Sequence, residues 1–222
     1  MVIDRRAIRK GLSVIATKDS DVAQALTRIS YPEPRIRPVG FEALLSIIVS
    51  QQISTGAARS IMDRVRALLP EISAPATLAL PDGALRKAGL SGRKVEYVTA
   101  LARAIVAGQF DPVTLAQQTD SQAIASICNL RGLGRWSAEV YLMFSLQRPD
   151  VFPAGDLALR RALQKLKGWD NRPNADEARA TVAHWMPWRT VGSLFLWHFY
   201  RGAPTCLLLK LVLSIPAVGR FS

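Results

Sequence analysis

The chain has 222 residues, of which 49% are hydrophobic and 21% are charged. This length and apolar content are typical of one large domain or two closely packed lobes with a substantial core, and they exclude a disordered chain. The two cysteines, Cys128 and Cys206, predict no disulfide framework and cannot supply the four thiolates of an iron–sulfur cluster. We therefore expect a protein of a reducing compartment, the cytoplasm.

Basic residues exceed acidic ones, with 29 Lys and Arg against 17 Asp and Glu and a formal net charge of +12. No single basic run accounts for the excess. Basic residues spread over a folded protein indicate a polyanionic partner, most often a nucleic acid, and a merely solvated basic surface is the alternative. The apolar segment 207–215 contains Lys210 and is too short to cross a bilayer, so we expect a docking strand or helix there.

Turn signals divide the chain into short helical segments. Pro38 to Phe41 precede a largely buried helix that ends at Gln51–Ser54, where Ser54 is typical of the cap of the next helix. The predicted helices after Ser54 extend to about Leu69 and then cover about 81–89, 92–108, 121–128, 136–147, 157–167, 175–184 and 187–200. Because no segment alternates as a strand does, we predict an all-α fold.

A glycine turn lies between two of these predicted helices. Gly132 and Gly134 permit backbone angles at which several amides point outward together, and such a helix start attracts anions. Arg135 adds positive charge, and Ser137 is placed to contact a phosphate or to cap the helix. An ordinary interhelical turn explains the pattern equally well. A dinucleotide-binding loop explains it less well, because the preceding segment is helical and Ser137 stands where a third glycine is needed.

A single acid, Asp156, follows about one helix after the glycine turn and directly precedes the predicted helix 157–167. Taken alone, Asp156 is typical of a helix cap. An ionised carboxylate in a water-poor site also stabilises positive charge that develops during a reaction. The two roles are compatible with each other.

Three blocks in this order resemble the helix-hairpin-helix DNA glycosylases, specifically the 3-methyladenine DNA glycosylase II branch. They are Ile48–Ser54 with Ala57 and Ala58, the glycine turn through Asp156, and Trp185–Thr190 through Trp197. The resemblance implies a two-lobed, all-helical fold with a DNA cleft between the lobes. It places one lobe at about 41–147 and the other at 1–40 plus 148–222. The short segment before the first block implies a compact form without an amino-terminal β-rich domain.

The resemblance also implies the roles of several side chains. Asp156 matches the catalytic acid that faces the sugar, and Trp136 and Trp197 match aromatic residues of the base pocket. Val140 and Leu157 stand at two further pocket positions that are aromatic in other members, which implies a wider pocket. Trp136 also occupies the position of the lysine that members with strand-cutting activity use for Schiff-base chemistry. We therefore expect a monofunctional glycosylase.

The remaining implied residues contact DNA. In the family the turn grips the backbone, and a residue at the position of Gln52 fills the gap left by the flipped nucleotide. The implied DNA-binding residues are Gln51, Gln52, Ser54, Gly132, Gly134, Arg135 and Ser137. Family members often hold a monovalent or magnesium ion through turn carbonyls, which here belong to Cys128, Leu130 and Leu133. We expect no required cofactor, double-stranded DNA with damaged bases as the partner, and a monomer.

The sequence thus predicts a hydrolase that excises alkylated purines, of the 3-methyladenine and 7-methylguanine type, from double-stranded DNA. Three alternatives stay open at this point. The first is a glycosylase for deaminated or etheno-modified bases, which the wider pocket allows. The second is a noncatalytic helix-hairpin-helix protein that recognises DNA structure, and the third is a basic regulator or RNA-binding protein.

Overall fold

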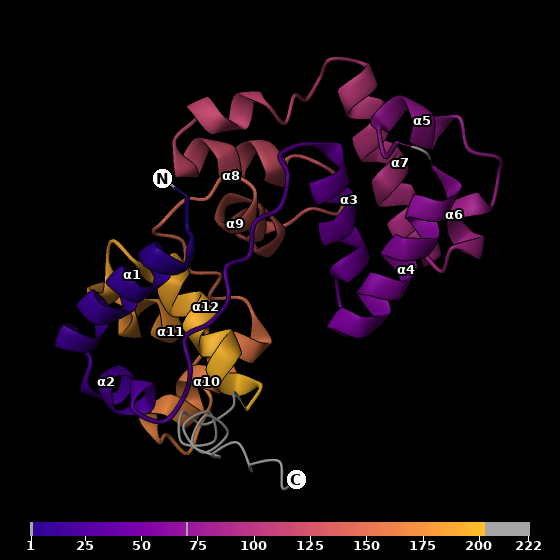
Figure 1. Ribbon diagram of the computed structural model, residues 1–222. Helices are drawn as coiled ribbons and strands as arrows, with labels where there is room; N and C mark the ends of the chain where they lie inside the picture. The colour runs from indigo at the N-terminus through magenta and orange to yellow at the C-terminus, as the bar shows by residue number, and fades with distance from the viewer. Residues whose placement is uncertain (1, 70, 203–222) are drawn as a thin grey trace, which may run out of the picture. The chain divides into compact units, whose positions relative to one another are not determined.

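The computed structural model describes residues 2–69 and 71–202 (Figure 1). The described chain contains twelve α-helices and two short 3₁₀ helices, and no strand occurs among the residues described. The predicted all-α class is confirmed. The helices belong to two compact units, one formed by residues 35–148 and the other by the described residues before 35 and after 148.

The discontinuous unit joins the two ends of the described chain. Its elements are α1 (Arg5–Lys18), α2 (Ser20–Leu26), α10 (Leu157–Lys167), α11 (Ala175–Thr181), η2 (Ala183–Trp185) and α12 (Arg189–Tyr200). In Figure 1 the indigo helices α1 and α2 lie with the orange and yellow helices α10 and α12. Apolar stripes of α1 and α10 and nearly the whole of α12 are buried, and these form the core of this unit.

The continuous unit contains the glycine turn. Its elements are α3 (Phe41–Ser50), α4 (Thr55–Leu68), α5 (Ala74–Leu78), α6 (Ala84–Lys87), α7 (Gly92–Val106), η1 (Thr114–Gln117), α8 (Asp120–Cys128) and α9 (Arg135–Phe144). Helices α3 and α9 are buried on almost all sides, and α3 packs against both α7 and α9. This packing brings the ends of α3 and α8 and the start of α9 into one region of the unit.

Local signals predict most helix ends. Ser54 caps α4 through a hydrogen bond from the Ala57 N–H at 3.2 Å, and Gly168 ends α10 in the left-handed conformation, with φ +65°. Helix α9 ends at Phe144, earlier than the predicted end at 147. The predicted helix 175–184 is instead α11 followed by η2. The predicted segment 81–89 becomes helical only at Ala84, because Gly83 takes a left-handed conformation.

Three helices were not predicted, namely α1, α2 and α5. Asp4 caps α1, and its side chain accepts from the Ala7 N–H at 2.7 Å. Cys206 and the apolar segment 207–215 lie outside the described residues. Among the residues that are described, no helix has the length and apolar character to span a membrane.

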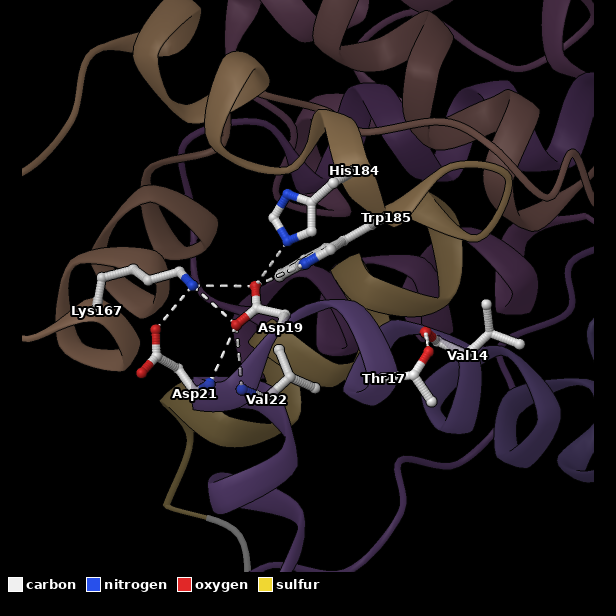
Figure 2. Close-up of polar contacts among 8 residues, drawn as sticks. All are labelled: Val14, Thr17, Asp19, Asp21, Val22, Lys167, His184 and Trp185. Atoms are coloured by element: carbon white, nitrogen blue, oxygen red, sulfur yellow. Dashed lines mark hydrogen bonds and ion pairs between the residues drawn. The ribbon is translucent and has the colours of Figure 1, made fainter.

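Asp19 is a buried carboxylate of the discontinuous unit, and Figure 2 shows its polar contacts. It receives hydrogen bonds from Lys167 Nζ at 2.8 Å and from the Trp185 indole N–H at 2.8 Å, and it lies 3.2 Å from His184 Nε2. Burial alone raises the pKa of Asp19, but the bonds from Lys167 and Trp185 outweigh it and lower the pKa below 3.8. The ionised carboxylate therefore joins α1 and α2 to α10 and η2.

Trp185 depends on a glycine for its place in this core. A Cβ on Gly192 would lie 2.3 Å from the Trp185 ring, so only glycine lets α12 approach the indole this closely. Trp185 is fully buried and Trp188 is nearly so, and both are therefore core residues.

We expect Asp19→Asn to lower the free energy of unfolding by about 3 kcal/mol at pH 7, because Lys167 loses the charge of its buried partner. Because its pKa is lowered on folding, the ionised Asp19 stabilises the fold at pH values above 3.8. This contribution is lost as the pH falls through the folded-state pKa of Asp19. Urea unfolding from pH 7 downward should therefore show a constant difference between wild type and variant that shrinks below about pH 4.

The matched control is Asp63→Asn, which removes an exposed ion pair with Arg66 and should cost less than about 1 kcal/mol. Equal losses in the two variants would contradict a structural role for the Asp19 charge.

Candidate functional site

The glycine turn between α8 and α9 requires glycine at position 132 for two reasons. Gly132 has φ +83°, a conformation that L side chains rarely adopt. A Cβ there would also lie 2.1 Å from Cγ of Tyr97, whose ring packs beneath the turn from α7. Leu133 is buried, and its N–H donates to the Leu130 carbonyl at 3.1 Å. The turn is therefore fixed by packing below and by one hydrogen bond within.

The start of α9 carries no side-chain cap from its N-cap residue. That residue is Gly134, which is exposed and has no side chain that could accept from the first N–H groups of α9. These amides and the helix dipole favour an anion at this end. The geometry agrees with the expectation of a phosphate contact, and it leaves the contact itself a prediction.

Gln51 holds the turn to the end of α3. Its Nε2 donates to the Gly132 carbonyl at 2.8 Å and to Ser137 Oγ at 3.2 Å. Ser137 is only 2% exposed, so its hydroxyl is used inside the protein and does not cap α9. This position gives no support to a phosphate contact by Ser137. Gln51 accordingly connects the α3–α4 turn to the α8–α9 turn.

The neighbouring Gln52 has an unusual backbone. It is exposed and has φ +56°, a left-handed conformation that costs a residue other than glycine on the order of 1 kcal/mol. The next residues return to an extended backbone at Ser54, which starts α4. The strained turn thus presents the Gln52 side chain to solvent at the position where a wedge residue was expected.

Two residues of α7 that sequence reasoning missed support the same region. Tyr97 lies beneath Gly132, and Lys94 Nζ donates to the Val49 carbonyl near the end of α3 at 2.7 Å. Burial lowers the pKa of Lys94. The segment 85–94 before and at the start of α7 is a basic turn, in which Gly89 has φ +105° and Ser91 caps α7. The residue types in this segment do not indicate the long-range contacts of Lys94 and Tyr97.

Arg135 is not an isolated cation. Its Nε donates to Glu139 Oε1 at 2.9 Å, one turn along α9, and the Glu139 side chain is only 4% exposed. The buried carboxylate therefore has its compensating charge at the surface, on a residue that sequence reasoning assigned to DNA alone. Glu139 was missed because a carboxylate on an apolar helix face gives no signal of its partner.

The expected pocket residues are divided between the two units. Trp136 is half-buried and Val140 is buried, and both belong to α9 in the unit of residues 35–148. Asp156, Leu157 and Trp197 belong to the other unit. Leu157 is exposed at the first position of α10.

Asp156 occupies the N-cap position of α10, as one of its two expected roles requires. Its Oδ1 accepts from the Leu159 N–H at 2.9 Å and from the Trp197 indole N–H at 3.2 Å. The residue is half-buried, whereas Trp197 is only 8% exposed. The structure therefore brings Asp156 and Trp197 together, through the indole N–H.

The segment before Asp156 is held by the start of α12. Arg189 makes a bidentate ion pair with Asp150, with Nε to Oδ1 and Nη2 to Oδ2 both at 2.8 Å. The buried Thr190 donates its N–H to the Pro149 carbonyl at 3.0 Å, and its Oγ1 accepts from the Val151 N–H at 3.0 Å. Helix α12 thus contacts both ends of the segment 149–156.

The two histidines have partners within the protein. His184 contacts Asp19, and His198 Nε2 lies 3.1 Å from Ser30 Oγ. No group of three or more His, Cys, Asp or Glu side chains suited to a metal ion occurs in the part of the chain that the structure describes. Of the turn carbonyls expected to bind an ion, that of Leu130 already accepts the Leu133 N–H and retains a second lone pair.

A family model and several known proteins match this chain, and they agree on one family. Residues 45–187 match the HhH-GPD superfamily base excision DNA repair protein model. A putative DNA-3-methyladenine glycosylase of Bacillus subtilis is 28% identical over 165 residues, which cover 71% of this chain and 58% of that protein. The match therefore spans little more than half the length of this relative.

Solved structures cover the chain more fully. The DNA-3-methyladenine glycosidase of Bacillus halodurans is 30% identical with a TM-score of 0.71, covering 86% of this chain and 89% of that one. The 3-methyladenine DNA glycosylase of Schizosaccharomyces pombe, in complex with abasic DNA, has a TM-score of 0.81 at 23% identity. It covers 85% of this chain and 95% of its own, and it shows the likeness of fold. The chain belongs to the HhH-GPD superfamily of base excision DNA repair proteins.

Proposed function

We propose that this protein is a monofunctional DNA glycosylase that hydrolyses the N-glycosidic bond of alkylated purines in double-stranded DNA. The observation that carries the proposal is the Asp156 carboxylate, held by two N–H donors at the start of α10 in a chain of this family. The names of the relatives from Bacillus subtilis and Bacillus halodurans support 3-methyladenine as a substrate.

One carboxylate suffices for this chemistry. As the bond from the sugar to the base breaks, its electron pair leaves with the base and positive charge develops on the sugar. The Asp156 carboxylate stabilises that charge, and water adds to the sugar and releases its proton to the solvent. A base alkylated at N3 or N7 is cationic and leaves neutral, so it needs little protonation by a general acid.

The cationic base also suits the expected pocket. Trp136 offers an aromatic ring, and a desolvated cation–π contact contributes on the order of 2 kcal/mol. Val140 and Leu157 stand where other members carry aromatic side chains, which leaves bases of different shape as substrates. Specificity for alkylated purines then depends on the charge of the base more than on close fit.

DNA binding in this proposal uses the two turns that Gln51 connects. The uncapped start of α9 binds a phosphate, and Gln52 fills the gap in the base stack and hydrogen-bonds the orphaned base. The net charge of +12 favours the polyanion at long range. An ion on the carbonyls of Cys128, Leu130 and Leu133 and the monomeric state stay predictions.

We expect Asp156→Asn to slow release of 3-methyladenine from alkylated duplex DNA by at least about 100-fold, because the charge that stabilises the sugar is lost while the cap is kept. Single-turnover assays with the free base quantified measure the effect. Asp4→Asn is the matched control, since Asp4 caps α1 in the same way. Base release by Asp156→Asn at the wild-type rate would disprove the catalytic role.

A second expectation concerns the DNA strand. Because position 136 holds Trp and not a Lys, the protein should leave an intact strand that breaks only after alkali. Denaturing gels of a duplex with one lesion, with and without alkali, measure this. Strand breaks without alkali, or trapping of a covalent complex by borohydride, would contradict the monofunctional assignment.

A third expectation concerns the glycine turn. Gly132→Ala should weaken binding to abasic-site duplex by roughly 10-fold or more, because its Cβ collides with Tyr97 and its φ is strained. Gly56→Ala is the control for the added methyl group, since a Cβ on Gly56 in α4 meets nothing within 4 Å and Gly56 is not one of the expected DNA-binding residues. Equal affinities of the two variants in a fluorescence titration would argue against the Gly132 geometry as the binding determinant.

A further inference from the structure

Trp197 presents its N–H, and very little of its ring surface, to the candidate site. The side chain lies on α12 among residues that are almost all buried, and it is 8% exposed. A tryptophan that stacks on a substrate base needs an open ring face. The hydrogen bond to Asp156 at 3.2 Å is the polar contact through which Trp197 reaches the site.

Two N–H donors of the same unit bind the same oxygen of Asp156. The Leu159 N–H and the Trp197 indole N–H both reach Oδ1, at 2.9 Å and 3.2 Å. A helix cap by itself leaves a carboxylate free to turn about its side-chain bonds. A second donor from another helix fixes that rotation, because turning the group breaks both bonds.

Helix α12 is well anchored for this purpose. Two turns before Trp197, Arg189 and Thr190 bind Asp150, Pro149 and Val151, at the other end of the segment that carries Asp156. Within the segment, the Asp156 N–H donates to the Pro153 carbonyl at 2.8 Å. The indole of Trp197 therefore lies on a well-anchored helix and donates to a residue in a segment that other hydrogen bonds also hold.

We propose that Trp197 is a positioning residue, which orients the Asp156 carboxylate through its indole N–H, and not a base-stacking residue. The proposal rests on the proposed glycosylase function. An oxygen misplaced by even 1 Å loses much of its effect on a charge that develops in the transition state, so the N–H acts on the rate of bond cleavage. Binding of DNA does not require it.

The direct test is Trp197→Phe, which keeps an aromatic ring and removes the N–H. We expect the single-turnover rate of base release to fall roughly 10- to 100-fold, while affinity for abasic-site duplex stays within about 2-fold of wild type. Loss of a stacking contact would instead be small for Phe, because Phe keeps an aromatic ring. An unchanged rate would overturn the proposal.

Trp185→Phe is the matched control. It removes the same N–H from another buried tryptophan of the same unit, which donates to Asp19 at 2.8 Å. Both variants lose a buried hydrogen bond to a carboxylate, so a general loss of stability affects both. Assayed below their unfolding temperatures, only Trp197→Phe should slow base release. Equal slowing in the two variants would overturn the specific role of Trp197.

A double-mutant cycle separates orientation from stacking. If Trp197 acts through Asp156, adding Trp197→Phe to Asp156→Asn should slow the residual reaction by less than about 2-fold. If the ring acts on the base, the full single-mutant loss should recur in the Asp156→Asn background. That recurrence would overturn the proposal.

A measurement that does not require catalysis distinguishes failure of this inference from failure of the proposed function. In ¹⁵N-correlated NMR spectra, Asp156→Asn should shift the indole signal of Trp197 more than those of the other four tryptophans. Asp19→Asn should shift that of Trp185 instead. A Trp197 signal that does not respond to Asp156→Asn would overturn the proposal. If the wild-type protein releases no base, the proposed function fails, and the NMR result still decides whether Trp197 holds Asp156.

Discussion

The hydrogen bonds from α12 to both ends of the segment 149–156 are the contacts on which the proposed chemistry depends. At one end Arg189 and Thr190 hold Asp150 and its neighbours, and at the other Trp197 holds Asp156. A half-buried carboxylate acts on a developing charge only when its distance and direction are fixed beforehand. The apolar helix α12, which is buried along almost its whole length, provides that fixed reference.

In the continuous unit, contacts from other helices likewise hold the glycine turn, whose backbone amides are the candidate DNA contact. The ring of Tyr97 and the amide of Gln51 hold the glycine turn from beneath and from the side. Lys94 ties the start of α7 to the end of α3. The resulting turn exposes the uncapped start of α9 without relying on the mobility of long side chains. Arg135 at this helix start neutralises the buried Glu139.

The sequence predicted the helices whose ends carry local signals. Ser54 and Gly168 marked boundaries because a cap and a left-handed glycine act within a few residues. It did not predict α1, α2 and α5, although Asp4 caps α1, and it placed the end of α9 later than Phe144. The cap by Asp156 was expected from its position before α10.

For the candidate site, the residue types predicted which side chains to consider, and the sequence did not predict which contacts these side chains make. Ser137 was expected at a phosphate, but the structure buries it against Gln51, 86 positions away in the chain. Trp197 was expected as a stacking ring, and its contact with Asp156 became visible only in the folded unit. Spacing along one helix cannot reveal such pairs, because they depend on how different helices pack.

The proposed cleavage of the glycosidic bond of alkylated purines is tested most directly with the wild-type protein. It is incubated with duplexes that each carry one defined lesion, and any free base is identified by mass spectrometry. We expect free 3-methyladenine or 7-methylguanine and an intact strand with an abasic site. Binding to abasic-site duplex without release of any alkylated base would contradict it.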